Sequence, residues 1–183
     1  INNLVNILKE KPLPIGHVGL SHTRWATHGK PTKINAHPHA DVSGKILIVH
    51  NGIIENYQEL KKELQGKGYH FVSETDSEVI AHLLHCFEKD DLLKAVQKTI
   101  KRLRGSFALA VISSDFPDRL IVARLGSPLI IGLGQGEYFA ASDVSAVLDH
   151  TRKIVYLKDG EVADMQKDRL AIFDAQGKKV TPK

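Results

Sequence analysis

Two stretches of this sequence concentrate side chains that could bind a small polar substrate and stabilise charge on it. In residues 19–29, hydroxyls, two histidines, an arginine and the only tryptophan follow a short apolar run. Arg24 offers a planar fork of donors suited to a carboxylate, and Trp25 offers a flat apolar wall. In the second stretch, Asn51 and Gly52 follow another apolar run. A carboxamide donor beside an unhindered backbone N–H is what a developing oxyanion requires.

Five segments carry a resemblance to a known family, and they occur in order along nearly the whole chain. They are His-Thr-Arg-Trp-Ala-Thr-His-Gly at 22–29, Asn-Ala-His-Pro-His at 35–39, His-Asn-Gly-Ile-Ile-Glu-Asn at 50–56, Ser-Glu-Thr-Asp-Ser-Glu-Val-Ile at 73–80 and Gly-Ser-Pro at 126–128. The sequence resembles the glutaminase domain of the glutamine:fructose-6-phosphate aminotransferases, within the class of N-terminal-nucleophile amidotransferases. The resemblance implies hydrolysis of the side-chain amide of L-glutamine, with no cofactor and no metal.

The resemblance also assigns roles to individual residues. Arg24 would hold the α-carboxylate of L-glutamine, and Asp76 would hold its α-ammonium group. The side-chain amide of Asn51 and the backbone N–H of Gly52 would form the oxyanion hole. The remaining members of the first motif would line the same substrate site: Trp25, Thr27, His28 and Gly29.

Each assigned role has a purely structural alternative. Arg24 alone would be an ordinary surface charge in a loop. Asp76 could be an early helix residue that the positive end of the helix dipole favours. Asn51 could be a turn residue at a strand end, with Gly52 supplying an unusual φ angle. The density of the first motif favours the functional interpretation for Arg24, and the family match favours it for Asp76.

The nucleophile is where the sequence departs from the family pattern. The resemblance implies a cysteine at the mature N-terminus, ahead of the first motif, whereas the printed sequence begins at Ile1 and its one cysteine is Cys86. Beside Phe87 in a predicted helix, Cys86 is expected to be buried and inert. We therefore expect residues 1–183 to be a glutaminase domain that is incomplete at its N-terminus, inactive alone, and of low stability or self-associating.

The expected partners follow from the resemblance and from composition. Ammonia would pass to a sugar-phosphate isomerase domain, absent from this chain, that makes glucosamine 6-phosphate, and the full-length enzyme would be a homodimer. The net charge of +4 is spread over short clusters, which argues against nucleic acid as a partner. The absence of a long apolar run argues against a membrane, and the lone cysteine fits a reducing, cytoplasmic compartment.

Two other functions remain open from the residues alone. A non-catalytic amino-acid-binding module would keep Arg24 and Asp76 without the chemistry. A metal-dependent hydrolase would use the histidine-rich segment 17–50, or the helical trio His82, His85 and Cys86. No His-Glu-x-x-His motif occurs, so metal binding is the weaker alternative.

The order of predicted elements favours an α+β domain, with strands, then helices, then many strands. Periodicity predicts helices ending near residue 9 and at 57–66, 78–87 and 91–103, and strands at 16–21, 46–50, 106–113, 120–124, 128–133, 138–141, 153–157, 161–164 and 170–173. Thr75 and Glu78 have the spacing of a capping box. The apolar strand 106–113 should be covered on both faces. The resemblance implies a four-layer αββα sandwich of two mainly antiparallel sheets, with the site at one edge.

Overall fold

The computed structural model describes residues 2–11, 16–23, 29–87 and 91–181, and describes side chains from residue 6 onward. Its helices, including short 3-10 turns labelled η, are α1 Asn2–Glu10, η1 Lys33–Asn35, α2 Tyr57–Gly66, α3 Glu78–Cys86, α4 Leu92–Ile100 and η2 Val144–Ala146. Its strands are β1 His39–Ala40, β2 Ile46–Ile54, β3 Gly105–Ser113, β4 Phe116–Leu125, β5 Ile130–Leu133, β6 Tyr138–Ala141, β7 Ile154–Tyr156, β8 Val162–Gln166, β9 Arg169–Phe173 and β10 Lys179–Val180.

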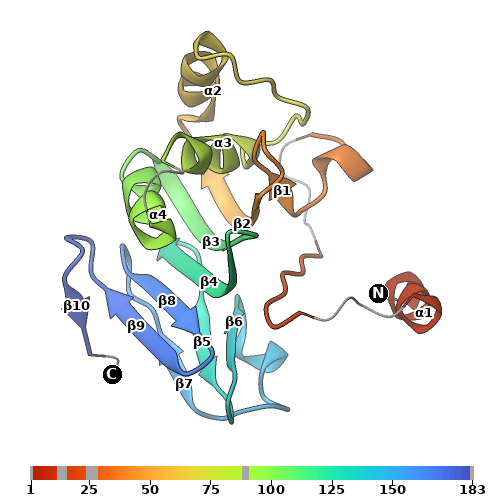
Figure 1. Cartoon of the computed structure of the whole chain (residues 1–183), viewed down its shortest axis with the longest axis vertical. Helices are drawn as coiled ribbons and strands as arrows, with labels where there is room; N and C mark the ends of the chain where they lie inside the picture. Colours follow the sequence, from red (N-terminus) through yellow and green to blue (C-terminus); the bar gives the residue numbers. More distant parts are fainter. Residues whose placement is uncertain (1, 12–15, 24–28, 88–90, 182–183) are drawn as a thin grey trace.

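The strands form two antiparallel sheets. The larger has the order β1-β2-β3-β4-β8-β9-β10, and the smaller has the order β6-β5-β7. The chain leaves the larger sheet after β4, builds the smaller sheet, and returns with β8 paired to β4. The α+β class and the pair of antiparallel sheets are as expected, and the sheets lie in successive layers below helices α2, α3 and α4 (Figure 1).

Two hydrophobic cores cover the opposite faces of the larger sheet. In β3, Leu109 and Val111 pack with helices α2 to α4, whereas Ala108 packs with residues of the smaller sheet. In β4, Ile121 packs in the core on the helix side, and Val122 packs in the core shared with the smaller sheet. Because successive strand side chains point to opposite faces, the continuous apolar run of β3 is explained by burial on both sides. This confirms the expectation for strand 106–113.

Four local expectations were wrong. Residues 16–21 form no strand, because they pair with no strand of the described chain. The strand expected to end at residue 50 continues to Ile54, and all nine of its residues pair with β3. Segment 29–44, for which the sequence predicted neither helix nor strand, contains η1 and β1. The capping box does not form, because Glu78 accepts hydrogen bonds from the backbone N–H groups of Val72 and Ser73 instead.

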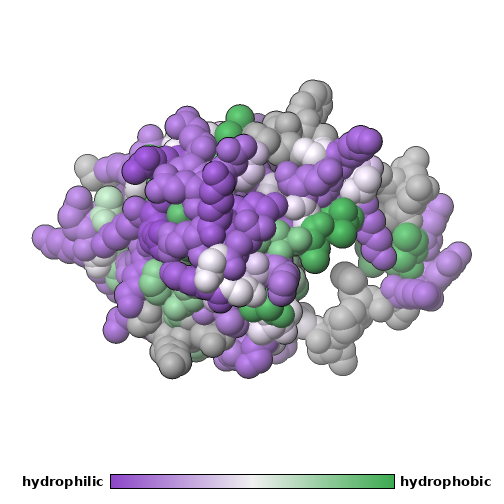
Figure 2. Space-filling model, turned by 90° about the horizontal axis from the view of Figure 1, so that it is seen from above, coloured by the Kyte–Doolittle hydropathy of each residue, from purple (hydrophilic) through white to green (hydrophobic). Residues whose placement is uncertain are grey.

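The face seen from above is mostly hydrophilic, with apolar residues in small groups (Figure 2). Among the described residues, no helix is both long enough and apolar enough to cross a membrane.

Candidate functional site

Strand β2 directs two neighbouring polar side chains to opposite faces of the larger sheet. His50 is 4% exposed and its Nδ1 lies 2.9 Å from the Ser77 hydroxyl, just before helix α3. Asn51 is exposed, and its Oδ1 lies 2.7 Å from Nε2 of His22. Asn51 is therefore a strand residue with a side chain available to a ligand, and not the turn residue that its position before a glycine predicts.

Gly52 lies in a strand position that only glycine can occupy. Its φ is +124°, and a Cβ atom added there would lie 2.1 Å from the Ser106 carbonyl oxygen and 2.9 Å from the Ser127 hydroxyl. The Gly126-Ser127-Pro128 motif thus lies directly against Gly52, although the two are far apart in sequence. Residue 52 carries no side chain because Ser106 of β3 and Ser127 occupy the space that a side chain would need.

Asp76 is almost fully buried between the end of β2 and the start of α3. It is 3% exposed, and its Oδ2 accepts a 2.7 Å hydrogen bond from the backbone N–H of Ile54. From the described part of the chain, its Oδ1 receives only a long 3.5 Å contact from the Ser77 hydroxyl. An ionised carboxylate has about four lone-pair sites, so Asp76 retains acceptor capacity for a cationic group beyond its structural bond.

Four of the predicted substrate-site residues lie outside the described residues: Arg24, Trp25, Thr27 and His28. Both flanks of that segment are described. His22 contacts Asn51, and Gly29 has φ +74° with its Cα side packed against Asn35 and Glu74. The first motif therefore begins beside the predicted oxyanion hole and ends beside the segment that carries Asp76.

Two hydrogen bonds between Asn35 and Glu74 hold the segment next to the end of that motif. Asn35 Nδ2 donates to Glu74 Oε2 at 3.0 Å, and Asn35 Oδ1 accepts from the Glu74 backbone N–H at 2.9 Å. The backbone N–H of Lys30 donates to the same Glu74 oxygen at 3.4 Å. The hydrogen bond from Asn35, followed by the one from Lys30, lowers the pKa of Glu74. The 35–39 and 73–80 motifs are thus joined through their polar side chains.

A buried polar chain supports the segment just before α3. Thr75 Oγ1 lies 3.1 Å from His39 Nε2 and 3.0 Å from the Ser73 hydroxyl, which donates to Glu78 Oε2 at 2.5 Å. His82 Nε2 lies 3.4 Å from the other Glu78 oxygen. Burial alone would raise the pKa of Glu78, but the contact with His82 and hydrogen bonds from Ser73 and the backbone outweigh it and lower that pKa to about 2. Glu78 is therefore a buried anion at neutral pH.

His50 is held neutral beside the site. Burial lowers the pKa of His50, and the nearby charge of Asp76 only partly opposes that effect. His22 and His39 also lower the pKa of His50. Burial thus keeps a neutral imidazole next to Asn51 in β2.

The metal-site candidates are engaged in other contacts. Within the described ranges, no group of three or more histidine, cysteine, aspartate or glutamate side chains could hold a metal ion. His85 Nδ1 lies 2.7 Å from the Tyr69 hydroxyl, and Cys86 donates to the same hydroxyl at 3.3 Å. The expected burial of Cys86 was wrong: the residue is exposed at the last position of α3, beyond the buried part of the helix that ends at Leu84.

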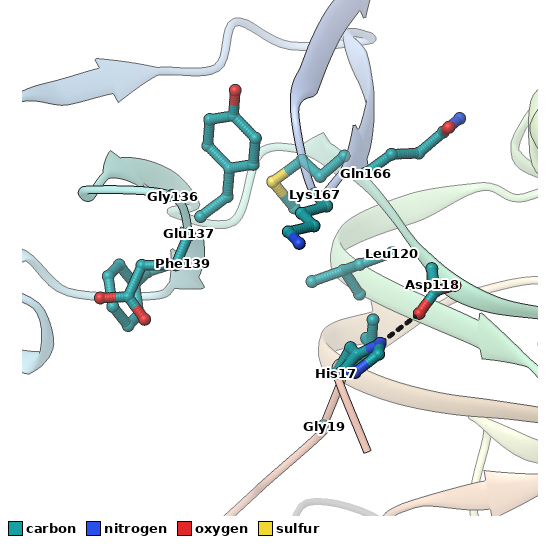
Figure 3. Close-up of a pocket in the computed structure, with 12 residues that line it drawn as sticks. His17, Gly19, Asp118, Leu120, Gly136, Glu137, Phe139, Gln166 and Lys167 are labelled. Atoms are coloured by element: carbon teal, nitrogen blue, oxygen red, sulfur yellow. Dashed lines mark hydrogen bonds and ion pairs between the residues drawn. The ribbon is translucent and has the colours of Figure 1, made fainter.

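A cavity of about 440 Å³ lies away from these residues (Figure 3). The N-terminal segment contributes His17 and Gly19, and the β5–β6 hairpin contributes Gly136, Glu137 and Phe139. His17 and Asp118 form a 2.7 Å contact at its edge (Figure 3). None of the predicted site residues that the structure describes lines this cavity. Its size therefore does not make it the candidate site, which is defined by the convergence of the motifs.

Comparison with known proteins shows the family to which these motifs belong. A family model described as "Glutamine amidotransferase domain" matches residues 22–149, more than half of the chain and the span that holds all five motifs. The chain belongs to the glutamine amidotransferase domain family. Within that family it is 57% identical, over 89% of its length, to a glutamine–fructose-6-phosphate aminotransferase [isomerizing] of Aquifex aeolicus. It is 50% identical, over 97% of its length, to the protein of that name from Methanosarcina acetivorans.

The matched span is only part of those relatives. The chain covers 28% of the Aquifex aeolicus protein and 31% of the Methanosarcina acetivorans protein. Solved structures of glutamine amidotransferases show the same fold. The glutamine phosphoribosylpyrophosphate amidotransferase of B. subtilis aligns over 84% of this chain and 34% of its own, with a TM-score of 0.72 at 24% identity.

Three functional candidates in this glutamine amidotransferase domain were missed by the sequence interpretation. They are His22, which contacts Asn51, and His39 and Ser77, which support the residues around Asp76. His22 lies two residues before Arg24 inside the first motif, and that position was the available signal. The contacts of His39 and Ser77 depend on long-range pairing that no local pattern reveals.

Proposed function

We propose that residues 1–183 are a glutamine amidotransferase domain that binds L-glutamine and stabilises the oxyanion formed when its side-chain amide is attacked. The observation that carries the proposal is that Asn51 and Gly52 lie on β2, and that the last residue of this strand, Ile54, donates a hydrogen bond to the buried carboxylate of Asp76. That arrangement offers amide donors for a negative charge and an acid for a positive one within a single site. Free L-glutamine carries both kinds of group.

Binding and chemistry divide among the proposed residues as follows. Arg24 holds the α-carboxylate and Asp76 the α-ammonium, which fixes the substrate at one end. Trp25, Thr27, His28 and Gly29 complete the wall of the site. The Asn51 carboxamide and the Gly52 N–H receive the oxygen of the scissile amide as it becomes negative, and removal of one such donor typically costs about 100- to 1,000-fold in turnover.

Cys86 does not supply the nucleophile in this proposal. It ends α3, about 12 Å along the helix axis from Glu78, on an exposed surface next to Tyr69. We assign the attack to a cysteine at the mature N-terminus of the whole protein, whose free α-amine, with an unperturbed pKa of about 7.7–8.0, would serve as the base. The thiolate forms a thioester, ammonia leaves, and water releases glutamate.

The activity of the whole protein is proposed from its relatives. The names of those relatives include fructose 6-phosphate and isomerisation, so ammonia would pass to a sugar-phosphate isomerase domain that produces glucosamine 6-phosphate. We further propose a homodimer of the whole protein in the cytoplasm, with no cofactor at the glutaminase site. Gel filtration with light scattering on the full gene product tests the dimer.

Two measurements on the 183-residue chain test the proposed function. Titration calorimetry should show L-glutamine binding that is lost in Arg24→Ala, with L-norleucine as a ligand control that lacks the side-chain amide. An ammonia assay should show no turnover by the same chain. Absence of glutamine binding by the folded chain would contradict the proposal, and turnover would show that a residue within 1–183 acts as the nucleophile.

A further inference from the structure

The orientation of the Asn51 carboxamide decides whether it helps or hinders the proposed chemistry. Its NH₂ end donates hydrogen bonds and stabilises an oxyanion, whereas its carbonyl end would repel one. Rotation of the carboxamide by about 180° exchanges the two ends at little steric cost, because they are nearly the same size. Something other than packing must therefore select the productive orientation.

His22 provides that selection. Its Nε2 lies 2.7 Å from Asn51 Oδ1, which is a short hydrogen-bond distance. A carbonyl oxygen can only accept, so Nε2 carries the hydrogen in this contact. We propose that His22 is a positioning residue of the oxyanion hole: its Nε2–H holds Asn51 Oδ1 and so turns the Asn51 NH₂ group toward the substrate. This inference rests on the proposed function of the site.

His22 is itself held in place by a row of aromatic rings. Its ring centroid lies 4.2 Å from that of His37, and the His37 ring meets the His39 ring edge-on at 4.7 Å. His39 is 5% exposed, and its Nε2 lies 3.1 Å from Thr75 Oγ1. A side chain braced in this way keeps its donor in one direction, which is what a positioning residue requires.

The row formed by His22, His37 and His39 ends at Thr75, next to the proposed ammonium acceptor Asp76. Thr75 directly precedes Asp76, and through the Ser73 hydroxyl it connects to the buried carboxylate of Glu78. The oxyanion donor Asn51 and the ammonium acceptor Asp76 are therefore positioned by one continuous set of contacts. A shift at either end of the row would change the distance between the two groups that hold the substrate.

The position of His22 also couples Asn51 to the first motif. His22 stands two residues before Arg24, so the hydrogen bond to Asn51 fixes the chain at the entry to the carboxylate-binding segment. A purely structural role for His22 would affect substrate binding and turnover alike. A positioning role would act on turnover through Asn51, and this difference makes the inference testable.

The kinetic test uses the full gene product and four variants: His22→Leu, His22→Gln, Asn51→Ala, and His22→Leu combined with Asn51→Ala. His22→Leu removes the donor, and we expect it to lower kcat for glutamine hydrolysis by about 10- to 100-fold with less than about a threefold change in KM. His22→Gln places an amide donor near the Nε2 position and should recover most of kcat. In an Asn51→Ala background, His22→Leu should lower kcat by less than about threefold further, because the group it positions is already gone.

His17→Leu is the matched control. His17 precedes the same motif and makes an equally short 2.7 Å contact, but with Asp118 at the edge of the separate cavity. Its removal should leave kcat unchanged. If His22→Gln is as slow as His22→Leu, or if His22→Leu costs the same factor with and without Asn51, the inference is wrong and His22 acts as a proton donor or a structural residue.

A second measurement separates this inference from the proposed function. In the 183-residue chain, the side-chain NH₂ resonances of Asn51, identified by their loss in Asn51→Ala, should move in His22→Leu and keep their positions in His17→Leu. Unchanged resonances in His22→Leu would show that the hydrogen bond is absent and overturn the inference. If instead the resonances move and the full gene product fails to hydrolyse glutamine, the proposed function fails while the contact stands.

Discussion

The carboxylate of Asp76 accepts a 2.7 Å hydrogen bond from the backbone N–H of Ile54, joining the segment before α3 to the last residue of β2. Because β2 also carries Asn51 and Gly52, this bond sets the separation between the proposed ammonium acceptor and the proposed oxyanion donors. Asp76 is thus both a structural residue and a candidate ligand-binding residue. The two interpretations of its position in the sequence are compatible.

Asp76→Asn separates the two roles of that residue. An asparagine oxygen can still accept from Ile54 N–H, so we expect the free energy of unfolding to fall by no more than about 1 kcal/mol. The loss of the negative charge should weaken L-glutamine binding by about 10- to 100-fold, since a charge-assisted hydrogen bond to the substrate ammonium is lost. Scanning calorimetry measures the stability of Asp76→Asn, and titration calorimetry measures its affinity for L-glutamine. The exposed Asp143→Asn is the control in both experiments. Unchanged affinity would leave Asp76 with a structural role only.

Gly52→Ala should destabilise the protein by more than about 3 kcal/mol. The added Cβ would lie 2.1 Å from the Ser106 carbonyl oxygen, and φ +124° is unfavourable for any L side chain. The backbone would have to separate from β3 at the oxyanion hole, so glutaminase activity of the full gene product should also be lost.

Gly66→Ala is the matched control for that substitution. Gly66 is the last residue of α2, and a Cβ there would meet no atom within 4 Å. Alanine should be neutral or stabilise by up to about 1 kcal/mol. Thermal unfolding compares the two variants, and equal effects would show that crowding at Gly52 is not what excludes a side chain.

Stability should fall with decreasing pH in a window that Glu78 sets. The folded-state pKa of Glu78 is lowered from 4.5 to about 2, so the unfolded chain binds its proton first. The contribution of Glu78 is therefore complete above about pH 4.5 and is lost as pH falls toward 2, for a total on the order of 3 kcal/mol.

Urea unfolding from pH 7 to pH 2.5 measures this contribution. Glu78→Gln should be less stable than the wild type at pH 7, and the difference should shrink as pH falls through the window. The exposed Glu10→Gln should keep the wild-type pH dependence. A constant difference between wild type and Glu78→Gln at all pH values would show that the ionised form of Glu78 is not the stabilising one.

Arg119 connects helix α4 to the larger sheet. We expect even its conservative replacement by lysine to lower the free energy of unfolding substantially. Its guanidinium donates twice to Asp164, at 2.9 Å from both Nε and Nη2, and also contacts Asp91, the N-cap of α4. Asp164 is 2% exposed, so its two carboxylate oxygens depend on Arg119 for hydrogen bonds that water cannot supply. Lysine keeps one charge but cannot form the paired contact, and Arg119→Lys should cost about 2–3 kcal/mol. The exposed Arg169→Lys on β9 should cost less than about 0.5 kcal/mol in the same urea unfolding experiment.

Local pattern determined much of this protein. The apolar run of β3 predicted a strand buried on both faces, the spacing of Leu60 and Leu64 predicted α2, and the density of polar residues around Arg24 marked the first motif. These features depend on the side-chain periods of 2.0 and 3.6 residues, or on residue types that folding alone does not demand. They could be identified without knowing which segments meet.

The tertiary structure decided what those segments contact. Asn51 and Gly52 look like a strand end followed by a turn, but pairing with Ala108 and Phe107 continues the strand through them. Glu78 has capping-box spacing, but in the folded chain its carboxylate accepts hydrogen bonds from the backbone N–H groups of Val72 and Ser73. His22 carries no local sign of its contact with Asn51, 29 positions away. Hydrogen-bond partners are chosen by which groups the packed sheets and helices bring within about 3 Å, and that choice does not exist until the chain has folded.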